Sequence, residues 1–152
     1  MWATHDNLAL AKIFDEAIQP VIPEADVRAE SFGEDCIYAD GHSTFSVMTN
    51  DLFFSLPVED LSAEEEFGNM IKQVLGVVAN LPKEKTKPGI EFVEFSFFKG
   101  EEQIILRIKF NEYVQTAGGI SGTDLFQKFY TPFPSVFTLV APTPTVTLTP
   151  NP

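Results

Sequence analysis

The stretch from Phe92 to Lys109 reads FVEFSFFKGEEQIILRIK and decides the fold class. Gly100-Glu101 forms a two-residue turn with glycine first, which is the preference of a type II′ hairpin. Centring the hairpin on this turn pairs Lys99 with Glu102. One face is then apolar and the other mostly polar, as in an antiparallel sheet with one solvated face. The further pairs are Phe97 with Ile104, Phe95 with Leu106, Glu94 with Arg107, Val93 with Ile108, and Phe92 with Lys109.

A helix precedes this hairpin in the sequence. From Phe67 to Val78, apolar residues recur at i, i+3, i+4, i+7, i+8 and i+11, which is one broad face of a helix. Ser62 and Glu65 have the spacing of a capping box, in which each side chain bonds the other's free backbone N–H. Pro82 ends the helix. An exposed basic loop over residues 83–89 then leads to the hairpin.

Two turn signals upstream of this helix predict a three-strand meander. Asp40-Gly41 is typical of a type I′ turn, whose two central residues need positive φ. Asn50-Asp51 is a second turn candidate. The two registers agree, because together they bring one row of side chains across all three strands: Cys36, Phe45 and Leu56.

A helix is also expected near each end of the chain. The first runs from about Asp6 to Gln19, with Asp6 as its N-cap, and prolines stop it. The last is short, begins near Thr123 or Asp124 and runs through Tyr130. The element order is therefore α-β-β-β-α-β-β-α.

These elements predict an α+β fold, with helices packed on one face of an antiparallel sheet. A chain of 152 residues can bury one core without disulfides or metals. We expect residues 1–131 to form a single domain. Residues 132–152, rich in Pro and Thr, are expected to form an extended tail with polyproline character.

The charge and the single cysteine restrict the function classes. A formal charge of −12 repels nucleic acid and anionic membrane surfaces, so we expect no direct nucleic-acid binding. One cysteine rules out an internal disulfide and a multi-cysteine metal site. No apolar run approaches the ~20 residues that cross a bilayer, and no leader pattern opens the sequence. We expect a cytoplasmic protein with no membrane span.

The sequence contains no recognisable catalytic or cofactor-binding pattern. Cys36, Asp40 and His42 are close in sequence, but the expected register turns Cys36 and His42 to opposite faces, so they form no nucleophile–base pair. Two histidines and scattered carboxylates lack metal-ligand spacing. The glycine-rich stretch 118–124 matches no phosphate-binding motif and is interpreted as a flexible loop before a helix cap. We therefore expect no cofactor and no enzymatic activity.

Aromatic residues beside the Pro-rich segment are candidates for an exposed interaction patch. Aromatic side chains are enriched at the energetic centres of protein interfaces. Such a patch would bind another protein or a second copy of this chain. The candidate interaction residues are Phe126, Phe129, Tyr130, Phe133 and Phe137.

Two resemblances point to binding without chemistry. The stretches Phe32-Gly33, Ile37-Tyr38-Ala39-Asp40-Gly41 and Asp51-Leu52-Phe53-Phe54 resemble the signature of TfoX N-terminal domains over about residues 8–56. That resemblance implies a non-enzymatic regulatory or adaptor module. The element order, small size and acidic pI are similar to those of class I type III secretion chaperones. This similarity implies a homodimer that binds extended segments of another protein.

Three functional hypotheses follow. The leading one is a non-catalytic protein-interaction module of the adaptor or chaperone-like kind, homodimeric. The alternative is an acidic inhibitor, either a DNA mimic or a phage-type antagonist of a nucleic-acid-binding enzyme, with its carboxylates gathered on one face. The third is an enzyme, which would need a deep pocket around Asp35, Asp40 or Glu94.

Overall fold

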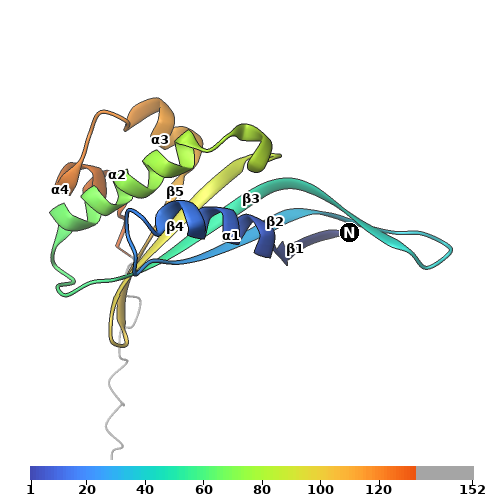
Figure 1. The fold of residues 1–152 in the computed structure, drawn as a ribbon, viewed down its shortest axis with the longest axis horizontal. Coiled ribbons are helices and arrows are strands. Elements are labelled where there is room, and N and C mark those ends of the chain that lie inside the picture. The colour runs from blue at the N-terminus through green and yellow to red at the C-terminus, as the bar shows by residue number, and fades with distance from the viewer. Residues whose placement is uncertain (133–152) are drawn as a thin grey trace, which may run out of the picture.

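The computed structural model describes residues 1–132 (Figure 1). Its class is α+β, as the sequence predicts. The elements in chain order are β1 (Trp2–Asp6), α1 (Leu8–Ile18), β2 (Asp26–Ile37), β3 (Ser43–Pro57), α2 (Glu64–Asn80), the 3-10 turn η1 (Lys83–Lys85), β4 (Ile90–Lys99), β5 (Glu102–Lys109), α3 (Phe110–Thr116) and α4 (Gly122–Phe129).

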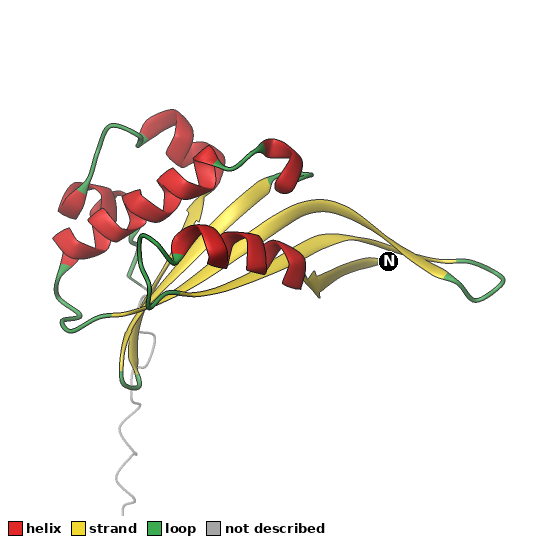
Figure 2. Cartoon of the chain, in the orientation of Figure 1, coloured by secondary structure: helices red, strands yellow, loops and turns green. Residues whose placement is uncertain are grey.

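The five strands form one sheet in the order β1-β2-β3-β4-β5. Three of the four strand pairings are antiparallel, but β3 and β4 are parallel, so the sheet is mixed where a purely antiparallel sheet was expected. The reason is the crossover through α2, which returns the chain to the end at which β3 began. The helices lie on one side of the sheet (Figure 2).

The β4–β5 hairpin forms in the register that the sequence predicts. Lys99 lies opposite Glu102, and the pairing continues without a shift to Phe92 opposite Lys109. Gly100 has φ +61°, as the first central residue of the predicted turn requires. Val93, Phe95, Phe97, Leu106 and Ile108 are buried on the helix side.

The prediction of a three-strand meander over this part of the chain is wrong. Asn50 and Asp51 make no turn, because β3 runs unbroken through them and pairs with a β2 that already begins at Asp26. The expected pairing of Cys36 with Phe45 is also shifted by one residue, since Cys36 lies opposite Thr44. The connecting loop holds five residues, 38–42, where the type I′ turn would have two.

The structure of the N-terminal residues also differs from the prediction. Trp2–Asp6 is an edge strand along β2, and α1 begins after it with Asn7 as its N-cap, whose Oδ1 accepts from the backbone N of Leu10 at 3.0 Å. Asp6 therefore belongs to β1 and is not the cap. Most side chains of β1 are exposed, so no apolar alternation marked it as a strand.

The apolar face of α2 fills the core as predicted, but the helix begins with a different N-cap from the predicted one. Phe67 is fully buried, and its ring stacks on Phe97 with centroids 4.3 Å apart. The capping box is wrong, because Ala63 is the N-cap and Ser62 Oγ donates to Asp60 at 2.7 Å instead. The other buried residues of this helix are Gly68, Ile71, Val74, Leu75 and Val78.

A buried polar network ties the crossover loop to the sheet. Ser31 Oγ donates to Asn50 Oδ1 at 2.7 Å, and Asn50 Nδ2 lies 3.2 Å from the carbonyl oxygens of Thr86, Lys87 and Gly89. Asn50 is 1% exposed, so these bonds satisfy an amide that water cannot reach. The residue that looked like a turn former thus holds β3 and the loop before β4 together.

Beyond this network, β2 and β3 continue away from the helices as a ribbon, residues 33–49, which we call the arm (Figure 1). Within the arm, β1 pairs only with the first two residues, Gly33 and Glu34. The arm starts at a bulge between Phe32 and Gly33. A Cβ on Gly33 would lie 2.1 Å from the backbone oxygen of Ser46, so only glycine allows this close approach.

Candidate interaction surfaces

Both arginines of the chain lie on the face of the sheet opposite the helices, which we call the open face. The guanidinium carbon of Arg28 is 4.1 Å from the ring centroid of Phe53, and that of Arg107 is 4.4 Å from the centroid of Phe92. The strand register aligns Arg28, Phe53, Glu94 and Arg107 in one row across β2–β5. Arginine and aromatic side chains dominate the binding energy of many protein interfaces.

A hollow of about 290 Å³ opens on this face next to that row. It combines three carboxylates with three phenyl rings, while a single guanidinium contributes positive charge. Its lining residues are Thr4, Glu30, Phe32, Thr49, Asp51, Phe53, Glu91, Phe92 and Arg107.

Asp51 is the most constrained acid of the hollow. Arg107 Nη2 donates to its Oδ2 at 2.6 Å, and the backbone N of Phe92 donates to its Oδ1 at 3.2 Å. Its pKa is nevertheless raised above the usual value, because partial burial disfavours the charged form by more than Arg107 favours it, and Glu91 and Glu30 add repulsion. A further cation in the hollow would therefore be stabilised by these carboxylates.

The arm carries apolar side chains in solvent. Ile37 is 72% exposed and Met48 is 56% exposed, and Trp2 stacks on Phe32 at the base with ring centroids 5.6 Å apart. Tyr38 and Val47 are exposed on the arm as well. Among residues 1–132 nothing packs on this ribbon beyond β1, and a ribbon of two strands alone is marginally stable in water.

The tip of the arm is acidic. The ring of His42 stacks on Tyr38 with centroids 4.2 Å apart, and its Nδ1 hydrogen bonds Asp40. The pKa of Asp40 is lowered, first by the hydrogen bond from the backbone N of His42 and then by the imidazole. Asp40 is thus an exposed, ionised carboxylate at the outermost turn.

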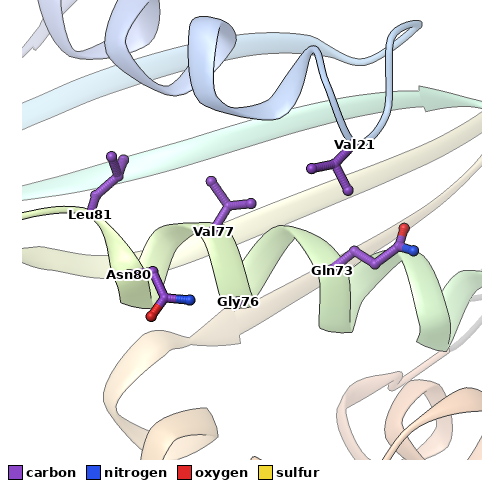
Figure 3. A pocket seen from close by; sticks show the side chains of 6 residues that line it. All are labelled: Val21, Gln73, Gly76, Val77, Asn80 and Leu81. Atoms are coloured by element: carbon purple, nitrogen blue, oxygen red, sulfur yellow. The ribbon is translucent and has the colours of Figure 1, made fainter.

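A second hollow, of about 420 Å³, lies between α1 and α2 (Figure 3). Figure 3 shows Val77 and Leu81 turned toward α1 and Val21 reaching down from the loop after it. Gln73, Gly76 and Asn80 complete the lining, so no ionisable side chain is present. This hollow suits apolar packing and offers no group for acid–base chemistry.

The aromatic patch expected near the C-terminus is placed differently. Phe126 is 1% exposed and packs edge-on against Phe67, with centroids 5.5 Å apart. Phe129 and Tyr130 are half-buried against the core. The cause is the close contact of α4 with α2, where a Cβ on Gly68 would lie 1.7 Å from Gly122 O. Phe133 and Phe137 lie outside the described residues.

The residues considered for chemistry are dispersed. Cys36 is a half-buried free cysteine, while His42 bonds Asp40 and His5 Nε2 lies 3.1 Å from Asp35 Oδ2. Within residues 1–132, no group of three or more His, Cys, Asp or Glu side chains could hold a metal ion. In the glycine-rich loop, the backbone N of Gly122 donates to Asn69 Oδ1 at 3.1 Å and so faces the protein.

The open face was not predicted from the sequence, because residues 26–32 were not assigned to a strand. Alternation of Arg28, Glu30 and Phe32 with Ala29 and Ser31 was the available signal. With the false turn at residues 50–51 removed, Asp51 and Phe53 fall on that same face.

No helix in the described part of the chain is long and apolar enough to cross a membrane. No family model, curated protein or solved structure matches the chain.

Proposed function

We propose that this chain is a non-catalytic protein-interaction module that acts as a homodimer and binds a basic segment of another protein on its open face. The observation that carries the proposal is the hollow in which Glu30, Asp51 and Glu91 surround three phenyl rings. Carboxylates and ring faces together recognise a lysine or arginine side chain.

Electrostatics support a basic partner. The hollow holds three carboxylates against the guanidinium of Arg107, and the whole chain has a formal charge of −12. A surface of this sign attracts a cationic partner and raises the rate of encounter. The partner's ammonium or guanidinium group also relieves the charge that burial disfavours on Asp51.

The homodimer is supported by the arm. Ile37, Tyr38, Val47 and Met48 together expose apolar side chains within this one short ribbon. Contact with a second copy removes this surface from water.

An inhibitor of a nucleic-acid-binding enzyme is a special case of this function, since such enzymes present basic surfaces. On the open face, however, the acids alternate with both arginines of the chain. That mixture favours recognition of a protein segment over imitation of a phosphate row.

The proposal is tested by titrating the isotope-labelled full chain with a hexalysine peptide, followed by amide NMR, with hexaglutamate as the control peptide. We expect shifts concentrated at Asp51, Phe92 and Arg107. Glu91→Gln should weaken hexalysine binding about twofold to fivefold, the size of one exposed ion pair. Glu112→Gln, the same change on α3, should leave affinity unchanged.

Equal weakening by Glu91→Gln and Glu112→Gln would contradict the proposal, because binding would then follow net charge alone. Shifts spread evenly over the molecule would do the same. Hexaglutamate is expected to cause no shifts.

A further inference from the structure

We infer that a second copy of this chain pairs antiparallel with the free edge of β3, residues 43–49, and joins the two sheets into one. The inference rests on the homodimer in the proposed function and specifies its interface. Among residues 1–132 the edge is free, because β4 begins at Ile90, opposite Asn50, and leaves the preceding part of β3 without a neighbour on that side.

The backbone groups that face this edge can be identified from the arm itself. The backbone N of Asp35 donates to Met1 O at 2.7 Å, away from β3, and Asp35 lies opposite Phe45. Opposed residues of an antiparallel ladder either both face each other or both face away. The N–H and C=O of Phe45 therefore point to the free edge, and those of Ser43 and Val47 follow with a period of two.

This edge lacks the features that prevent an exposed edge strand from pairing with a strand of another molecule. The sequence of residues 43–49 is STFSVMT, with no charged residue and no proline. The edge strand β5, in contrast, carries Glu102, Arg107 and Lys109, and β1 has only five residues and ends in Asp6. Charges and short length discourage edge pairing, so 43–49 is the edge most open to another strand.

Charge complementarity selects a second copy as the occupant. When two such edges align antiparallel about Phe45, Ser43 of one copy lies opposite Val47 of the other, and the loop 38–42 that precedes Ser43 extends toward Asn50 of the other copy. Asn50 contacts the carbonyls of residues 86, 87 and 89, so the lysine loop (Lys83, Lys85 and Lys87) flanks that position. The acidic tip, Asp40, thus meets the basic loop of the other copy, and the twofold axis repeats the contact.

The first experiment measures the dimer dissociation constant of the full chain by sedimentation velocity. Val47→Lys places a charge on the paired edge and should raise that constant about tenfold or more. Ile105→Lys on edge strand β5 is the matched control, because the two side chains are 36% and 37% exposed. The control should dimerise like the unchanged chain.

A charge swap separates edge pairing from a folding defect. Asp40→Lys alone and Lys85→Glu alone should each raise the dissociation constant about threefold, the scale of an exposed ion pair. The double variant should return to within about twofold of the unchanged chain. A damaged fold would not recover in this way.

The possible outcomes test the edge pairing separately from the homodimer on which it rests. A chain that stays monomeric at all concentrations overturns both the inference and the homodimer. A dimer that tolerates Val47→Lys and Asp40→Lys, or that dissociates with Val77→Lys in the α1–α2 hollow, overturns the inference alone.

Discussion

The two hairpins of this protein, β4–β5 and β2–β3, follow the same rules with different results. In β4–β5 the turn residues predict every pair from Lys99–Glu102 to Phe92–Lys109. In β2–β3 a turn signal of comparable strength, Asp40-Gly41, predicts a register that is wrong by one residue.

The difference lies in what surrounds each turn. Buried residues alternate along β4 up to Phe97, two residues before its end, so burial and turn chemistry favour the same register. Ile37 and Tyr38 beside the other loop are exposed, and no buried face selects between registers there. Contacts far from the loop, at Gly33 and Asn50, decide the pairing instead.

The largest effect is expected for Asn50→Ala. The change removes the acceptor of the Ser31 hydroxyl and the side-chain donor to the carbonyls of Thr86 and Lys87, which should lower the free energy of unfolding by about 3 kcal/mol or more. Urea denaturation followed by circular dichroism measures it. Asn111→Ala, on the exposed start of α3, should change stability by less than about 0.5 kcal/mol. Similar values for both variants would mean that the network does not hold β3.

Gly33→Ala should have the next largest effect on the free energy of unfolding. Its Cβ would meet the backbone of Ser46, and a backbone atom cannot turn aside as a flexible side chain can, so we expect a loss of about 2 kcal/mol. Gly119→Ala meets nothing within 4 Å and serves as the control. Amide NMR should show the largest shifts in the arm. Unshifted arm signals would contradict the role of the bulge in setting its register.

Glycine-to-alanine changes in the two turns should have smaller and unequal effects on stability. Gly100 and Gly41 have φ of +61° and +86°, and a Cβ at either position meets no neighbour. Gly100→Ala should cost about 1 kcal/mol of global stability. Gly41→Ala should cost less than half of that, since the tip can fray without unfolding the body. Equal costs in thermal denaturation would show that the tip is coupled to the core.

The smallest effect concerns Asp51, which links the two hairpins through Arg107. Because its pKa is raised, the folded state holds the proton more tightly than the unfolded chain does. Stability from this group is present at low pH and is lost as pH rises through the folded pKa. The unchanged chain should therefore lose stability relative to Asp51→Asn as the pH rises from about 3 through the raised pKa of Asp51 in urea titrations. The opposite slope would mean that Arg107 outweighs burial.

The open face and the aromatic residues of α4 show which contacts could be predicted from the sequence and which could not. Glu94 and Arg107 were paired correctly from the turn alone, but Arg28 and Phe53 joined their row only through β2–β3 and β3–β4 pairing. Phe126 looked like an interface residue because it precedes a Pro-rich segment. Its burial depends on the approach of two glycines, Gly68 and Gly122, that are 54 residues apart in the printed sequence.

By itself, the sequence determined the α+β class, the buried face of α2 and the register of β4–β5, because periodicity and turn chemistry act between near neighbours. Only the tertiary structure decided that Asn50 lies within a strand, since its partners Ser31 and Thr86 are distant in the chain. The parallel pairing of β3 with β4 was likewise decided there. Polar side chains such as asparagine satisfy a turn or a buried network equally well, and only the fold supplies the partners that choose between them.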